Sequence, residues 1–296
     1  MNTFHHLCGI LNTTESTIDF CRRKNLLSSS YTCCNRQCGQ VGNKERSDGM
    51  EYKCYSCGKR YSLRTGSFFF NSRLTLVKLV TIIYFFARNL SPTVGKGMVM
   101  GDINISSITT WYIYLRQICT TYVTNNPVKL GGPGKVVQMD ETCWGRKRKA
   151  GRGDVRCQSE HKWIFGMVDV ETKLRHIVHV ENRNRRTLFP IIAAHVLPNS
   201  TVHTDEAAVY TSLANNHGYV HRTVNHSENY VAADGTHTNN IESYWSRLKI
   251  ELRNKRGMNI DNLQLHLNEI MYRDNRGREG DIFDLLIQDI STSYPV

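Results

Sequence analysis

Three acidic residues stand where carboxylates often take part in chemistry. Asp140 ends the apolar run Val-Val-Gln-Met-Asp, Asp205 ends Thr-Val-His-Thr-Asp, and Glu242 opens an expected helix. In open α/β sheets such strand ends face the functional crevice. Carboxylate oxygens suit divalent cations, and two such cations can activate an attacking oxygen and stabilise the leaving oxygen of an in-line displacement. If the fold gathers these acids, they predict a site for two cations.

Each acid also has a structural explanation. Asp205 follows Asp140 by 65 residues and Glu242 follows Asp205 by 37, so only the fold can bring the three together. Asp140 could be a surface group at a strand end, and Asp205 could cap the following helix. Glu242 lies three residues after Asn239, which is the layout of a capping box. Spacing alone therefore leaves capping and metal binding both open.

A cysteine-rich segment offers a second kind of metal chemistry. Five of the ten cysteines fall within residues 33 to 57, and glycine directly follows Cys38 and Cys57. Four thiolates suit tetrahedral zinc, and glycine lets the backbone amides turn toward sulfur. The 15 residues between Cys38 and Cys54 leave room for a short hairpin. We predict structural Zn²⁺ on Cys34, Cys38, Cys54 and Cys57, with Cys33 possible in place of Cys34; the alternative is incidental cysteines.

The sequence pattern divides the chain into five parts. Their predicted bounds are 1–30 (unclear structure), 31–70 (zinc ribbon), 71–125 (helical, DNA-binding), 126–134 (linker) and 135–296 (catalytic). In the last part short strands alternate with helices, which predicts an α/β fold whose early strands pair as a meander. The predicted strands are Val136–Asp140, Trp163–Val170, Arg175–Val180, Val202–Thr204 and Tyr219–Thr223. The predicted helices are Arg185–Val196, Ala207–Asn216, Ile241–Leu252 and Asn262–Arg273.

The helical part could contain a DNA-binding motif. Residues 91–115 fit a helix, a turn and a second helix that starts near Ser106 or Ser107, and such a second helix can enter the major groove. A plain pair of packed helices fits the same apolar pattern equally well.

The charge of the chain favours a polyanionic partner. Its 38 Lys and Arg residues against 26 Asp and Glu give a net charge of +12, and nucleic acid is the most frequent partner of such a surplus. The predicted contacts with the DNA backbone are Arg146, Lys147, Arg148, Lys149, Arg152 and Lys249. A solvated loop or a nuclear-import signal would also explain the first five.

Two further observations concern location and single histidines. No run of about eighteen apolar residues and no secretory signal is present, so no membrane partner is predicted. His226 and His237 could contact DNA or water near the cations, although a lone histidine is more often structural.

Taken together, the motifs resemble those of a known family. From Cys34 to near Phe283 the chain is similar to Merlin-type DDE transposases, relatives of the bacterial ISXO2-like insertion-sequence transposases that carry an N-terminal zinc ribbon. The motifs that carry the resemblance occupy residues 54–68, 131–142, 144–148, 163–169, 188–192, 196–198, 204–205, 223–227 and 237–245.

The resemblance implies a function in DNA recombination. It implies a ribonuclease H-like mixed-sheet catalytic domain with a DDE triad of Asp140, Asp205 and Glu242 that holds two Mg²⁺ or Mn²⁺ ions. The expected activity is cleavage and strand transfer of a cut-and-paste transposon. The partners would be double-stranded DNA, as terminal repeats and target, and a second copy or more of the chain. The alternative is a domesticated DNA-binding protein without activity. In a eukaryotic host we expect a nuclear location, and otherwise a cytoplasmic one.

Overall fold

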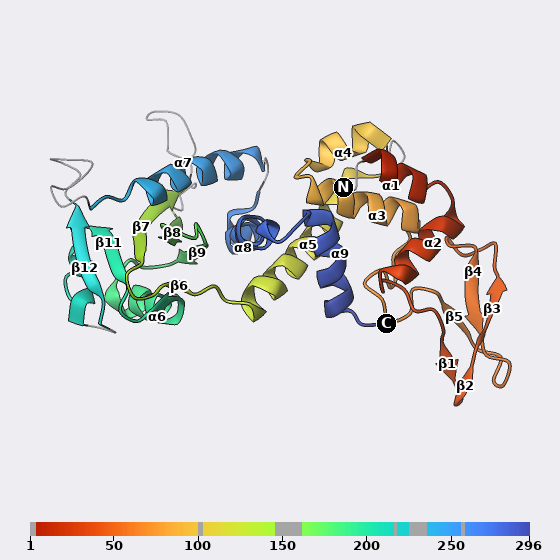
Figure 1. The fold of residues 1–296 in the computed structure, drawn as a ribbon. Helices are drawn as coiled ribbons and strands as arrows, with labels where there is room; N and C mark the ends of the chain where they lie inside the picture. The colour runs from red at the N-terminus through yellow and green to blue at the C-terminus, as the bar shows by residue number, and fades with distance from the viewer. Residues whose placement is uncertain (1–3, 100–102, 146–161, 216–217, 225–235, 256–257) are drawn as a thin grey trace. The chain divides into compact units, whose positions relative to one another are not determined.

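A computed structural model describes residues 4–99, 103–145, 162–215, 218–224, 236–255 and 258–296 (Figure 1). The chain forms two compact units, one of residues 1–119 with 279–296 and one of residues 120–278. Within the described ranges no helix combines the length and apolarity needed to cross a membrane.

The second unit is built on a mixed five-stranded sheet. Its strands are β7 (Val136–Trp144), β8 (Lys162–Asp169), β9 (Arg175–Val180), β11 (Thr201–Asp205) and β12 (Val220–Val224). The sheet order is β12-β11-β7-β8-β9. β7, β8 and β9 form an antiparallel meander, whereas β11 runs parallel to β7 and β12 parallel to β11. The predicted mixed α/β sheet and its early meander are confirmed.

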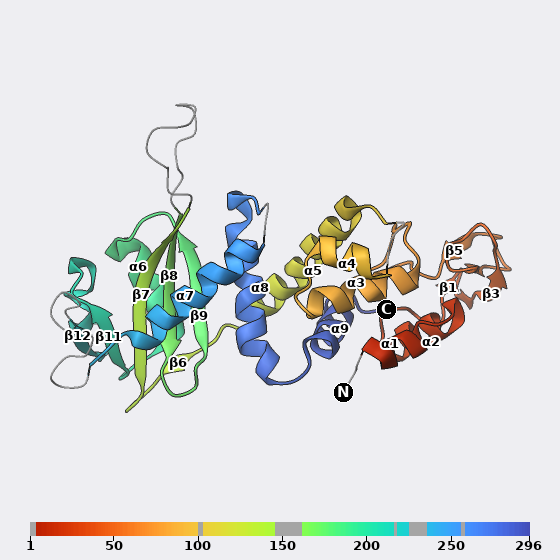
Figure 2. The same cartoon turned by 90° about the horizontal axis from the view of Figure 1, so that it is seen from above.

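Helices cover both faces of this sheet (Figure 2). Alternate strand residues point to opposite faces, so each strand contributes to two cores. On one face Met139 and Phe165 pack with Leu188 of α6 (Arg185–His195). On the other face Ile164 and Ile177 pack against the apolar residues of two helices. These helices are α7 (Asn239–Asn254) and α8 (Leu263–Asn275).

Two predicted elements of this unit differ in the structure. β7 continues four residues beyond Asp140, because Glu141 to Trp144 pair with β8. The helix predicted over residues 207–216 is replaced by the 3₁₀ turns η1 (Ala208–Tyr210) and η2 (Leu213–Asn215). Tyr210 ends the first of these turns and Leu213 begins the second, and both side chains are buried, so the segment packs into the core through two short turns in place of one helix. The remaining short elements are β6 (Leu130–Gly131), β10 (Val196–Leu197), η3 (Ile260–Asn262) and η4 (Arg276–Arg278).

The first unit is centred on a buried helix, α3 (Leu76–Ala87). The ring of Phe283 in α9 (Ile282–Ser293) lies against Phe20 of α2 (Thr14–Arg23) and against Tyr84 of α3. Arg88 pairs with Asp281 at 2.7 Å. Residues 279–296 therefore pack in this unit, whereas the sequence pattern grouped them with the catalytic part. The apolar stripe of α9 predicts burial but does not identify the surface that buries it.

The other elements of the first unit include the cysteine-rich segment. β3 (Gly39–Gly42), β4 (Met50–Lys53) and β5 (Arg60–Ser62) form an antiparallel sheet, and β1 (Thr32–Cys33) pairs with β2 (Arg36–Gln37). A hairpin thus connects Cys38 to Cys54. The helices are α1 (Phe4–Ile10), α4 (Pro92–Val99) and α5 (Ile105–Asn125), of which α5 continues into the second unit. α4 and α5 lie where the two DNA-binding helices were predicted; their role in DNA binding remains a prediction.

Candidate functional site

Asp140 and Asp205 lie side by side on neighbouring strands. β11 pairs with β7 in parallel register, with His203 opposite Gln138. Asp140 and Asp205 each lie two residues beyond this last pair, and the charge of Asp205 acts on the Asp140 carboxyl. Residues in register on neighbouring strands point to the same face of the sheet, so the strands themselves bring these two carboxylates together.

The first turns of α7 bring Glu242 to the same face. The indole Nε1–H of Trp245 donates to Oδ2 of Asp140 at 2.9 Å. The Trp245 ring covers Gly166 of β8 so closely that any side chain there would collide with it. Glu242 lies one helical turn before Trp245, and Thr238 donates a hydrogen bond to its Oε1 at 2.8 Å. Packing of α7 on the sheet thus sets the position of Glu242.

The three acids interact electrostatically. The pKa of Asp140 is raised to about 6, first by burial and then by the negative charges of Asp205 and Glu242, while the hydrogen bonds from Trp245 and the Glu141 amide oppose the rise. In the described part of the chain, the carboxylate oxygens of these three residues do not all lie within 4.8 Å of one another. A wider spacing suits carboxylates that divide between two cations about 3.5–4 Å apart.

The start of α7 is capped differently from the prediction. Thr238, not Asn239, is the N-cap residue, and its side chain makes no capping bond. Instead, the side chain of Gln138 reaches from β7, and its Oε1 accepts hydrogen bonds from the amides of Asn240 (2.9 Å) and Ile241 (3.2 Å). Its Nε2 donates to the His237 carbonyl at 2.8 Å. The cap comes from a residue about a hundred positions away, which no local sequence signal could show.

Replacing Gln138 by Leu is therefore expected to loosen the start of α7. Gln138 is fully buried. Its loss leaves the Asn240 amide unpaired and removes one of two partners from the Ile241 amide and from the His237 carbonyl, at a cost of about 1–3 kcal/mol in the free energy of unfolding. Hydrogen exchange at the Asn240 and Ile241 amides should accelerate. The matched control is Gln40→Leu, which alters an exposed glutamine of the first unit. Unchanged exchange at the two amides in Gln138→Leu would contradict this role.

A fourth acid lies next to the three. Glu141 accepts a hydrogen bond from the Tyr210 hydroxyl, and burial raises the pKa of its carboxyl. Because it follows Asp140 directly in β7, its side chain points to the opposite face of the sheet. The guanidinium of Arg183 stacks 3.6 Å from the Trp163 ring centroid, and its positive charge opposes part of this rise in the pKa of Glu141. Tyr210 and Arg183 could not be predicted as neighbours of this acid, because neither belongs to a recognisable motif.

The predicted DNA contacts are only partly within the described residues. Arg146, Lys147, Arg148, Lys149 and Arg152 fall in 146–161, and His226 falls in 225–235, both outside the described ranges. Lys249 is half-buried on α7, two turns beyond Glu242. His237 lies next to Gln138, with its Nδ1 3.1 Å from the Gln138 Nε2. The position of His237 fits a structural role at the start of α7.

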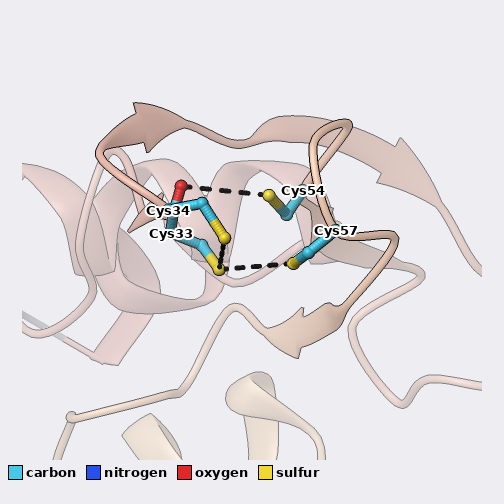
Figure 3. Close-up of side chains that lie close together, drawn as sticks. All are labelled: Cys33, Cys34, Cys54 and Cys57. Carbon is cyan, nitrogen blue, oxygen red and sulfur yellow. Dashed lines mark hydrogen bonds between the residues drawn. The ribbon is translucent and has the colours of Figure 1, made fainter.

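The cysteine cluster has the geometry of a metal centre. The sulfurs of Cys33, Cys34, Cys54 and Cys57 all lie within 4.8 Å of one another, as Figure 3 shows. A tetrahedral zinc with bonds of about 2.3 Å separates its sulfurs by about 3.8 Å. The distances from Cys33 to Cys34 (3.7 Å) and to Cys57 (3.6 Å) are close to that value. These four residues therefore fit a divalent metal ion.

Two further observations bear on the ligand set. The predicted ligand Cys38 lies outside this group of four, yet its side chain is hydrogen-bonded to Cys54. The backbone amides of Cys57 and Ser56 donate toward the Cys54 sulfur and lower its pKa to about 6. Amides turned toward sulfur are the feature that a knuckle followed by glycine predicts. Five thiols thus gather where four are needed.

Comparison with known proteins places this geometry in a family. Residues 129–275 match the ISXO2-like transposase domain. An uncharacterized transposase-like protein of Haemophilus influenzae is 30% identical over 118 residues, which cover 40% of this chain and 94% of that protein. The chain belongs to the ISXO2-like transposase family. Asp140, Asp205 and Glu242 all fall inside the matched domain, whereas the cysteine cluster lies before it.

Solved structures offer only weak likenesses to this transposase-family chain. A chain of the simian T-cell lymphotropic virus intasome, solved in complex with PP2A regulatory subunit B56 gamma, has a TM-score of 0.33 at 13% identity, with 65% of this chain and 67% of that chain covered. The HTLV-2 integrase catalytic core domain in complex with magnesium (dimeric form) has a TM-score of 0.29 at 13% identity, with 48% and 84% covered. Such low scores carry no further conclusion.

Proposed function

We propose that the chain is a Merlin-type DDE transposase that cleaves DNA and joins the freed end to target DNA. One observation carries the proposal: Asp140 and Asp205 lie on neighbouring strands, each two residues beyond the paired Gln138 and His203, and the charges of Asp205 and of Glu242 on α7 both act on the Asp140 carboxyl. The order β12-β11-β7-β8-β9, with its meander followed by two parallel strands, supports a ribonuclease H-like domain.

The acids fit a pair of divalent cations. A buried carboxyl whose pKa is raised by burial and by two further carboxylates is a site where negative charge is poorly compensated. Mg²⁺ or Mn²⁺ held by Asp140, Asp205 and Glu242 would supply charge neutralisation for both the attacking and the leaving oxygen. The chain's own part is positional: Trp245 orients Asp140, and Gln138 fixes the helix that carries Glu242.

The other parts of the chain would hold DNA. We propose a structural zinc in the cysteine cluster, backbone contacts from residues 146–152 and Lys249, and DNA contacts from α4 and α5. Two element ends must be brought together for cut-and-paste transposition, so we propose that a homodimer or a larger assembly acts. The net charge of +12 supports a DNA partner.

A strand-transfer assay tests this function. The full chain, Mg²⁺, candidate terminal repeats and a target plasmid should yield first nicked repeat DNA and then joined product. Binding without either product would favour the domesticated DNA-binding protein, and nicking without joining would indicate a nuclease of the same fold. Either of these outcomes, obtained with repeats that the chain binds specifically, would overturn the proposal.

A further inference from the structure

A groove lies within the first unit. It has a volume of about 530 Å³ and runs between the segment 68–74 and the first half of α5. Its lining combines aromatic rings with hydroxyl, amide and guanidinium groups and includes no Asp or Glu. A volume of this size falls within the range of about 300–1,000 Å³ that is usual for compact ligands.

Three exposed aromatic rings surround this groove. Phe70 is 53% exposed, and Tyr114 and Tyr294 are each 42% exposed. Single exposed apolar residues are normal on a protein surface, but several around one groove suggest a binding site. Beneath them Trp111 meets the edges of Phe68 and Tyr114, each at a centroid distance of 5.4 Å. These edge-to-face contacts fix the orientation of Tyr114.

Polar side chains line the groove on both of its sides. Ser107, Thr110, Tyr114 and Gln117 recur at helical spacing, so they form one stripe along α5 that faces the groove. Across the groove, Arg73 is exposed and forms no ion pair with any acid of the described residues. Its guanidinium is therefore available to a phosphate.

The segment that carries Phe70 and Arg73 is held in place before any ligand arrives. The buried Arg64 donates from Nη1 to the carbonyls of Ser72 (3.1 Å) and Leu74 (2.7 Å). The same guanidinium is paired through Nε with Asp48 at 2.6 Å. A preformed loop loses little conformational entropy when a ligand binds, which favours affinity.

We propose that this groove binds an unpaired nucleotide of a DNA strand, with its base against Phe70 and Tyr114 and its phosphate against Arg73. Bases in a duplex are stacked on one another and offer no free face to a ring, whereas an unpaired base stacks readily on exposed aromatic side chains. The lining contains no acidic residue, and the chain has a net charge of +12. Both observations favour a nucleic acid over a basic peptide as the ligand. The inference rests on the proposed function in one respect: staggered cleavage of the two strands at a DNA end leaves unpaired nucleotides.

The test is a binding measurement on the full zinc-loaded chain, in the absence of Mg²⁺ so that no cleavage occurs. Fluorescence anisotropy compares three labelled duplexes: one with a three-nucleotide overhang, one with the same overhang made of abasic sites, and one blunt. We expect the overhang with bases to bind most tightly. Phe70→Ala should weaken that binding about tenfold and remove the preference over the abasic overhang, whereas Phe70→Trp should keep it. Arg73→Gln should lower the slope of log affinity against log salt by about 0.7.

The matched control is Val220→Ala, because Val220 is 51% exposed on β12 of the second unit and does not line the groove; its affinities should equal those of the wild type. Equal binding of the base-bearing and abasic overhangs by the wild type would overturn the proposal. The proposal would also be overturned if Phe70→Ala converts a dimer to a monomer in sedimentation but keeps the base preference. The groove would then bind a second copy of the chain. If the chain lacks strand-transfer activity but keeps the base preference, the result supports nucleotide binding in the groove. It then contradicts only the proposed transposase function.

Discussion

Replacing Asp140 by Asn is expected to abolish DNA cleavage and strand transfer while raising the stability of the metal-free chain. Asn keeps the size of the side chain but removes the charge that would hold a cation between Asp140 and Asp205. We expect activity to fall at least about a thousandfold, equivalent to about 4 kcal/mol of lost transition-state stabilisation. Binding of repeat DNA should be nearly unchanged, because the DNA contacts lie on other residues.

The stability gain follows from the raised pKa of Asp140. The unfolded carboxyl ionises near its ordinary value of 3.8, but the folded one ionises at about 6. The folded state therefore binds the proton more tightly, and above pH 6 the ionised carboxylate costs up to about 3 kcal/mol. Asn carries no such charge but cannot accept both hydrogen bonds, from Trp245 and from the Glu141 amide, so we expect a net gain of about 1–2 kcal/mol at pH 7.5.

The pH dependence makes this prediction specific. The difference in unfolding free energy between Asp140→Asn and the wild type should be full above pH 6 and should shrink as the pH falls toward 3.8. Urea unfolding in EDTA at several pH values measures it, with Asp261→Asn, an exposed carboxylate of the same unit, as the control. Mg²⁺ should then stabilise the wild type and not the variant. Retained Mg²⁺-dependent cleavage by Asp140→Asn would exclude Asp140 from the metal site.

The regular elements of the second unit could be predicted because each has a strong local pattern. β9 begins and ends at the predicted residues, and α6 differs by one residue at its end. The errors arise where tertiary contacts determine the structure. The extension of β7 beyond Asp140 depends on pairing with β8, and the 3₁₀ turns after Asp205 depend on the burial of Tyr210 and Leu213. Neither contact can be predicted from the residues of the segment alone.

The candidate site shows the same limit. The residue types at Asp140, Asp205 and Glu242 suggested metal chemistry, but their approach required the register between β7 and β11 and the packing of Trp245 on Gly166. The predicted capping box correctly placed Glu242 in the first turn of α7, but it named the wrong capping residue. Gln138 replaces a local cap with one from the sheet, so the start of α7 and the strand that carries Asp140 are fixed to each other. Positioning residues of this kind become visible only in three dimensions.

Removing zinc is expected to have the second large effect, a loss of structure in the cysteine-rich segment. Structural zinc contributes an apparent 10–16 kcal/mol to the folding of small zinc domains at neutral pH, and β3, β4 and β5 are too short to form a stable sheet without it. A strong chelator should therefore abolish binding of repeat DNA, and added Zn²⁺ should restore it. Repeat binding that survives complete removal of zinc would contradict this role.

The five clustered thiols make the ligand set testable one residue at a time. Cys54→Ser and Cys57→Ser should each lose the single expected zinc, because the second knuckle has no spare cysteine. Cys33 and Cys34 are adjacent, and their sulfurs are 3.7 Å apart, so either can replace the other. Each single serine variant should keep about one zinc per chain, and the double variant should lose it, with exposed Cys8→Ser as the control. Cys38→Ser decides the remaining ligand: loss of zinc supports Cys38 as the buried fourth thiolate, whereas full retention would show that Cys33 and Cys34 bind together.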